Sequence, residues 1–185
     1  MRADAVSQVR CYDSPFEWEA EPMSDPATVK PHVIIVGYGQ PARGDDGIGW
    51  VAARKLGERF SYEPRVKVIA VHQLTAELAE RLGTAALVVF IEAAQGQRPG
   101  HLSCTFITAS RAGAQQPNIG PADLLAIRAS RDGRCPQGMV FTVAGEDFGQ
   151  RDTLTRTVER ACERLVDHVY RIVIDELEHA PADDV

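Results

Sequence analysis

The sequence predicts a single α/β domain, a three-layer structure in which helices cover both faces of a twisted, largely parallel sheet of five strands. Two observations predict this fold class. The chain has 185 residues, enough for one domain with a substantial core and too few for two ordinary ones. Short apolar runs, typical of strands buried on both faces, alternate with segments of helical periodicity, as they do where helices connect parallel strands.

The first half of the domain contributes two strands and two helices. VIIVG (33–37) is a continuous apolar run and predicts the first strand. After a glycine-rich loop, apolar residues recur at helical spacing over 48–60, which predicts the first helix. VKVIAV (66–71) predicts the second strand. TAELAERLG (75–83) predicts a helix that begins at the threonine hydroxyl and ends at the glycine.

The second half contributes three strands and two helices. ALVVFIE (86–92) is the most apolar strand, so we expect it at the centre of the sheet. LSCTFIT (102–108) predicts the next strand, and PADLLAIRAS (121–130) predicts a helix with proline in its first turn. GMVFTVAG (138–145) predicts the last strand, and 152–178 predicts a long amphipathic helix.

The segments outside these elements are predicted to be unstructured. Residues 1–31 show neither a strand nor a helix period and carry prolines at positions 15, 22, 26 and 31, which predicts a flexible arm. Residues 179–185 are expected to form a short tail. The predicted domain therefore spans residues 32–178.

Composition excludes several classes of function. A net charge of −6 and a pI near 5.4 argue against a nucleic-acid partner. The four cysteines lack zinc-site spacing, and Cys104 and Cys162 fall within apolar patterns that predict burial. No apolar stretch is long enough to cross a membrane, and no signal peptide is evident, so we expect a reduced, cytoplasmic protein without a membrane partner.

The loop GYGQPARGDDGIG (37–49) carries the acidic pair Asp45-Asp46 and allows three hypotheses. A dinucleotide fingerprint would require an acidic residue at the end of the second strand, but that strand ends in Val71-His72. A pyrophosphate would also meet two carboxylates at the helix start, so this hypothesis is disfavoured. A helix cap needs only one aspartate. A metal or catalytic site therefore stays open for the other.

Three polar side chains come at or just after the ends of successive strands. Asp46 follows the first strand, His72 follows the second and Glu92 closes the third. In parallel α/β sheets, ligands bind beyond the carboxyl ends of the strands. A carboxylate at the end of the most apolar strand must reach a wet cleft or be buried at considerable cost, which favours a functional role for Glu92. We expect Asp46 and Glu92 to face a common cleft.

Several dispersed motifs resemble those of the nickel-iron hydrogenase maturation proteases. VIIVGYGQPARGDDGIGWVAARKL is similar to the opening of that family, with its strand, glycine loop and acidic pair. HQLTAELAERLGTAALVVFIEAAQGQRPGHL is similar to its middle section. PADLLAI, GRCPQGMVFTVAGEDF and LTRTVERA resemble the C-terminal section of the branch that processes soluble, multi-subunit hydrogenases. The resemblance covers about residues 33–175, with the motifs in order.

The resemblance implies an aspartic-type endopeptidase that removes a C-terminal extension from a hydrogenase large-subunit precursor after nickel insertion. The nickel belongs to the substrate and is recognised rather than permanently bound. The family's two acidic residues correspond to Asp46 and to Glu92, where relatives usually have aspartate. Its histidine is expected before the 121–130 helix, where Gln116-Pro117-Asn118 stand instead.

Because proline cannot ligate a metal through its side chain, a replacement imidazole could come from His72 at the neighbouring strand end, with His101 as a more distant candidate. The metal group expected from the sequence is therefore Asp46, Glu92 and His72, with both carboxylates catalytic. Two other functions stay open. One is a non-catalytic paralogue that binds a hydrogenase subunit or another partner without cutting it. The other is a small-molecule or nucleotide enzyme, because fold does not fix function.

Overall fold

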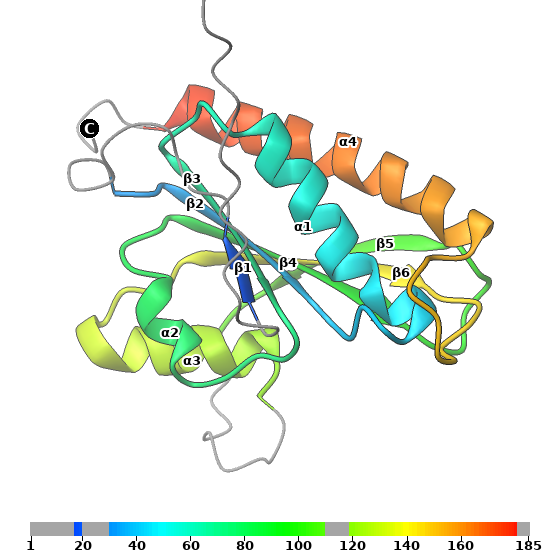
Figure 1. The fold of residues 1–185 in the computed structure, drawn as a ribbon. Coiled ribbons are helices and arrows are strands. Elements are labelled where there is room, and N and C mark those ends of the chain that lie inside the picture. The colour runs from blue at the N-terminus through cyan, green and yellow to red at the C-terminus, as the bar shows by residue number, and fades with distance from the viewer. Residues whose placement is uncertain (1–16, 20–29, 110–118, 181–185) are drawn as a thin grey trace, which may run out of the picture.

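The computed structural model describes residues 17–19, 30–109 and 119–180, which form a six-stranded sheet with helices on both faces (Figure 1). The strands in chain order are β1 (Glu17–Glu19), β2 (Val33–Tyr38), β3 (Val66–Val71), β4 (Leu87–Ala94), β5 (Leu102–Ile107) and β6 (Gln137–Ala144). The helices are η1 (Gly44–Gly47), α1 (Ile48–Arg59), α2 (Leu78–Arg81), α3 (Pro121–Asp132) and α4 (Arg156–His179).

The five strands predicted from apolar runs are confirmed as β2 to β6, in a sheet of order β1-β3-β2-β4-β6-β5. β2 pairs in parallel with β3 and with β4, and β4 pairs in parallel with β6. β5 pairs antiparallel to β6 at one edge. Since β4 has a paired neighbour on each side, the central position predicted for residues 86–92 is confirmed.

The strand β1 was not predicted. Its backbone pairs antiparallel with β3, with Glu17 opposite Val71 and Glu19 opposite Ile69, inside the segment expected to be a flexible arm. A three-residue edge strand leaves too short a pattern for periodicity to detect. The rest of that arm, residues 1–16 and 20–29, and most of the predicted tail, residues 181–185, lie outside the described residues.

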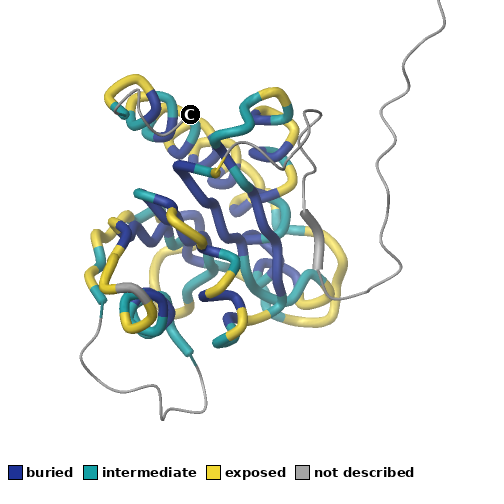
Figure 2. Tube along the Cα trace, turned by 90° about the vertical axis from the view of Figure 1, so that its left-hand side faces the viewer, coloured by how far each residue is buried: buried dark blue, intermediate teal, exposed yellow. Residues whose placement is uncertain are grey.

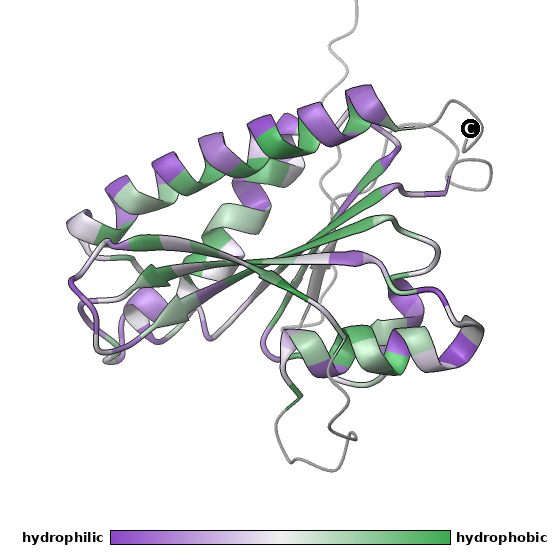
Figure 3. Cartoon of the chain, turned by 180° about the vertical axis from the view of Figure 1, so that it is seen from behind, coloured by the Kyte–Doolittle hydropathy of each residue, from purple (hydrophilic) through white to green (hydrophobic). Residues whose placement is uncertain are grey.

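The helices form two layers, with α1 and α4 over one face of the sheet and α2 and α3 over the other (Figure 1). The apolar residues of α4 form one stripe along its length, facing the sheet, while its outer side is hydrophilic (Figure 3). The buried members of that stripe are Val158, Ala161, Cys162, Leu165, Val166, Val169, Val173 and Leu177. No helix among the described residues is long and apolar enough to cross a membrane.

Two predicted helices begin later than expected. The helix predicted at 75–83 is the single turn α2, because the amides of Leu78 and Ala79 donate to carbonyls three residues back, so turns precede it. The last helix begins at Arg156 rather than at 152, because the side chain of Thr155 accepts a hydrogen bond from the amide of Val158 and caps it.

The central strands are buried along most of their length (Figure 2). Alternation of their side chains divides the core between the two faces of the sheet. Val89 and Ile91 of β4 pack toward α1 and α4, whereas Val88 and Phe90 pack toward α2 and α3. All four are fully or almost fully buried. This alternation places Glu92, the next residue after Ile91, on the face that carries α2 and α3.

Candidate functional site at the carboxyl ends of β2 and β4

The glycines of the 37–49 loop are required by the packing of the protein on itself. A Cβ on Gly37 would collide with the carbonyl oxygen of Gly49, and a Cβ on Gly39 would collide with the backbone of Asp46. Gly39 also has a backbone φ of +134°, a conformation that residues other than glycine rarely adopt. These glycines therefore let α1 and η1 sit directly on the ends of the strands. A dinucleotide is not needed to explain them.

Asp45 is a structural residue. It is fully buried, and its carboxylate accepts hydrogen bonds from the amides of Glu146 and Asp147 at 2.8 and 3.0 Å. It also accepts from the amide and the hydroxyl of Thr155, at 2.7 and 3.0 Å. Asp45 thus joins the first loop to the residue that caps α4, instead of capping its own helix. The helix-cap hypothesis was therefore wrong for Asp45, which caps no described helix and instead holds Thr155, the residue that caps α4.

Asp46 has a different environment from its neighbour. It lies in η1, at the carboxyl end of β2, and is only half-buried. Its Oδ2 atom accepts one hydrogen bond, from the backbone amide of Gln40, at 3.1 Å. Among the described residues, this contact orients the side chain without enclosing the whole carboxylate in donors. Of the two aspartates, Asp46 is therefore the one suited to meet a ligand.

Glu92 lies near the carboxyl end of β4, the strand that pairs with β2, so it shares an edge of the sheet with Asp46. The hydroxyl of Tyr38 donates a short hydrogen bond to Oε2 of Glu92. The hydroxyl of Thr142 donates to Oε1 at 3.3 Å. Burial, together with the charge and the hydrogen bond of Glu92, raises the pKa of Tyr38 far above its ordinary value. Tyr38 therefore stays protonated and acts as a donor.

His72 lies apart from this group. It follows β3, and its ring packs against that of Trp50 in α1, with the centroids 5.1 Å apart. The indole of Trp50 in turn donates to the carbonyl of Val71 at 2.9 Å. Because Val71 packs on the face of the sheet that Glu92 shares, alternation directs His72 to the other face.

The three ligands expected from the sequence are not brought together. Within the part of the chain that the structure describes, no group of three or more His, Cys, Asp or Glu side chains could hold a metal ion. Residues 110–118, which contain the Gln116-Pro117-Asn118 segment, lie outside the described residues.

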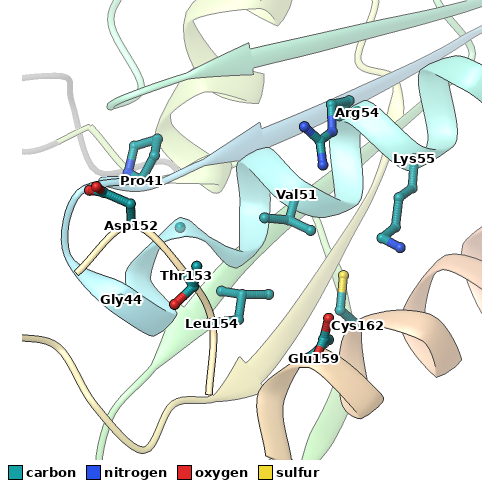
Figure 4. Close-up of a pocket in the computed structure, with 11 residues that line it drawn as sticks. Pro41, Gly44, Val51, Arg54, Lys55, Asp152, Thr153, Leu154, Glu159 and Cys162 are labelled. Atoms are coloured by element: carbon teal, nitrogen blue, oxygen red, sulfur yellow. The ribbon is translucent and has the colours of Figure 1, made fainter. Parts of the chain in front are cut away.

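A separate cavity of about 430 Å³ lies on the α1 and α4 side of the first loop (Figure 4). Its lining includes Arg54 and Lys55 from α1 and Glu159 and Cys162 from α4. Lys55 is already paired with Glu163, at 2.6 Å. Neither of the two candidate carboxylates lines this cavity, so it is distinct from the predicted site.

Two residues of the site escaped the sequence analysis, Tyr38 and Thr142. Each is far from Glu92 in the chain, by 54 and 50 residues respectively. Only the order of the strands brings them beside it, and the sequence patterns do not contain that order. Their hydroxyls stand at the end of β2 and near the end of β6, both otherwise apolar strands, and this was the available signal.

Comparison with known proteins places the fold. No protein-family model matches the sequence, and no curated protein matches it significantly. The hydrogenase maturating endopeptidase HybD from E. coli superposes with a TM-score of 0.64 at 20% identity, over 78% of this chain and 93% of that one. This chain has the fold of the hydrogenase maturation proteases.

Two archaeal structures have the same fold. The NiFe hydrogenase maturation protease HycI from Thermococcus kodakarensis has a TM-score of 0.63 at 19% identity, over 78% of this chain and 94% of that one. The hydrogenase 2 maturation peptidase from a Thaumarchaeota archaeon has a TM-score of 0.59 at 22% identity, over 78% and 98%. Nearly the whole of each relative is matched, so the similarity extends over a complete domain.

Proposed function

We propose that this protein is an endopeptidase that removes the C-terminal extension of a nickel-iron hydrogenase large-subunit precursor after nickel has been inserted. The observation that carries the proposal is the position of Asp46 and Glu92. The Glu92 carboxylate of β4 and the Asp46 carboxylate of η1, in the loop after the neighbouring strand β2, stand at the carboxyl edge of a sheet whose fold matches solved hydrogenase maturation endopeptidases. This is the edge at which α/β sheets bind their ligands.

The chemistry of the two side chains is compatible with this role. Carboxylates are hard oxygen ligands and can approach a metal that the substrate already holds through its own thiolates. A carboxylate within hydrogen-bond reach of the attacking water can also accept its proton. Water then adds across the C–N bond: the large subunit keeps a new carboxylate, and the extension leaves with a new amino terminus. We place this reaction in the cytoplasm.

The direct test uses the purified full chain and a nickel-loaded, unprocessed large subunit from the same organism. We expect mass spectrometry to show the large subunit losing its extension, and the same precursor without nickel to stay intact. Asp46→Asn and Glu92→Gln should each abolish the mass change. Processing of the nickel-free precursor at the same rate would contradict recognition of the metal.

A non-catalytic function is the alternative outcome of the same experiment. The segment Gln116-Pro117-Asn118, in place of the histidine expected from the resemblance, is the observation that favours it. In that case the protein would bind the nickel-loaded precursor in a pull-down or by calorimetry, and the mass of the precursor would not change.

A further inference from the structure

We propose that Tyr38 and Thr142 are positioning residues that hold the Glu92 carboxylate in the single orientation in which it meets the metal carried by the substrate. This inference rests on the proposed function. It adds two residues, one on each side of the carboxylate, that act through Glu92 and do not themselves touch the metal.

The register of the sheet places the three side chains in one row. In the parallel pairing of β2 and β4, Gly37 lies opposite Ile91, so Tyr38 and Glu92 follow as the next residues on the two strands. On the other side of β4, Glu92 lies opposite Thr142. Adjacent strands are about 5 Å apart, and side chains in one row project to the same face. Glu92 therefore has a hydroxyl on each flank.

Each hydroxyl engages a different oxygen of the carboxylate. Tyr38 donates to Oε2 and Thr142 donates to Oε1. Rotation of the carboxylate out of this orientation would break both hydrogen bonds at once. Because both donors stand on strands of the central sheet, they are themselves held in place. This is the arrangement by which groups behind a metal ligand fix its direction.

The row is polar where its neighbours on the same face are apolar. Two residues earlier on each strand stand Val36, Phe90 and Val140, all of them buried. Hydrophobic packing alone would therefore be served by apolar residues at 38 and 142 as well. The two hydroxyls occur at the one position in these strands where there is a carboxylate to hold.

The length of the Glu92 side chain is part of the arrangement. Aspartate would withdraw the carboxylate by one carbon–carbon bond, about 1.5 Å, and a hydrogen bond does not survive such a displacement. Glu92→Asp should therefore lose the contacts with the hydroxyls although it keeps the charge. If the Tyr38 hydroxyl has already been removed, shortening Glu92 breaks only the hydrogen bond from Thr142, so the further loss of stability should be smaller.

The first arm of the test measures this dependence without the substrate. Thermal unfolding of the full chain is compared for Tyr38→Phe, Glu92→Asp and the double variant. We expect the Tm of the double variant to lie well above the value obtained by adding the two single shifts. Tyr170→Phe is the matched control for Tyr38→Phe. It also removes a tyrosine hydroxyl, but Tyr170 stacks on Phe60 at the end of α1, on the other face of the sheet from Glu92. Additive shifts for Tyr38 and Glu92 would overturn the proposal.

The second arm measures binding of the large-subunit precursor with and without nickel. We expect Tyr38→Phe and Thr142→Val to weaken binding of the nickel-loaded precursor by about 10- to 100-fold and to leave binding of the nickel-free precursor unchanged. A defect in folding would instead weaken both. Thr105→Val, which removes an exposed hydroxyl from β5, is the control for Thr142.

The outcomes separate this proposal from the proposed function. If the wild-type protein neither binds nor cuts the nickel-loaded precursor, the proposed function fails, whatever the unfolding data show. If the wild-type protein processes the precursor and both hydroxyl variants bind and process it equally well, the function stands and the positioning role is wrong.

Discussion

At the residue scale, the acidic pair Asp45-Asp46 divides into one buried structural carboxylate and one half-buried carboxylate for which we propose a functional role. Asp45 accepts four hydrogen bonds in a fully buried position, so Asp45→Asn replaces an acceptor oxygen by an amide that faces donors. We expect it to lower the free energy of unfolding by about 2–4 kcal/mol, measured by urea denaturation.

The neighbouring substitution is the control for this prediction. Asp46→Asn keeps an oxygen that can accept from the amide of Gln40, so the free energy of unfolding should fall by less than about 1 kcal/mol. Processing of the nickel-loaded precursor should nevertheless be lost. The assignment of the two roles would be reversed if Asp46→Asn destabilised the protein more than Asp45→Asn.

The thiol of Cys162 should be inert although it lies at the edge of a cavity. Burial raises its pKa to about 12, so almost none of the reactive thiolate is present at pH 8. Cys104 and Cys135 are exposed. We expect a maleimide to label these two in the folded protein and Cys162 only after denaturant is added, as read by peptide mass mapping. Labelling of native Cys162 as fast as Cys135 would contradict this.

At the scale of the elements, five of the six strands were predictable, but the edge position of β5 was not. The apolar runs predicted β2, β3, β4 and β6 because strands buried on both faces must be apolar throughout, and the shorter apolar pattern at 102–108 predicted β5. Nothing in the run at 102–108 distinguished an antiparallel edge strand from a central one. For that reason the predicted burial of Cys104 was wrong: half of β5 is exposed.

The start of α1 depends on a glycine at position 49. A Cβ there would lie 2.7 Å from the carbonyl oxygen of Ile91 and closer still to the backbone of Tyr38. Backbone atoms of two central strands cannot move aside, so Gly49→Ala should cost at least about 3 kcal/mol of stability in spite of alanine's higher helix propensity. Urea denaturation measures the loss.

A second glycine variant shows whether that loss comes from the close contact. At Gly120, the residue before α3, the one described atom that a Cβ would meet is the carboxylate oxygen of Asp123, at an ordinary distance of 3.5 Å. Gly120→Ala should therefore cost less than about 1 kcal/mol. Equal losses at the two positions would mean that the approach of α1 to the sheet is not the cause.

At the scale of the whole molecule, the sequence selected the edge of the sheet at which the candidate residues lie, but not their arrangement there. The rule that ligands bind at the carboxyl ends of strands selected Asp46 and Glu92, and both stand at that edge. The rule also selected His72, because it does not consider which face of the sheet a side chain takes. The partners of Glu92 required the strand order β2-β4-β6, which only the packing of the complete domain determines.

The sheet extends into the N-terminal segment through β1, so deleting this segment tests what β1 contributes to the fold. The strand β1 covers the outer edge of β3 over three residues, while the apolar core lies within residues 33–177. Deleting residues 1–29 should therefore leave a domain that unfolds cooperatively. The loss of a few edge hydrogen bonds should lower its stability by about 1–2 kcal/mol.

Far-ultraviolet circular dichroism in urea is the suitable measurement, because the deletion removes Trp18, one of the two tryptophans, and so alters fluorescence by itself. A shorter deletion, of residues 1–14, keeps β1 and should match the full chain. Uncovering β3 also exposes unpaired backbone groups, so the longer deletion should self-associate more readily in size-exclusion chromatography, as open sheet edges do. If the longer deletion lost its cooperative transition while the shorter one kept it, β1 would be an essential part of the fold rather than a cover for its edge.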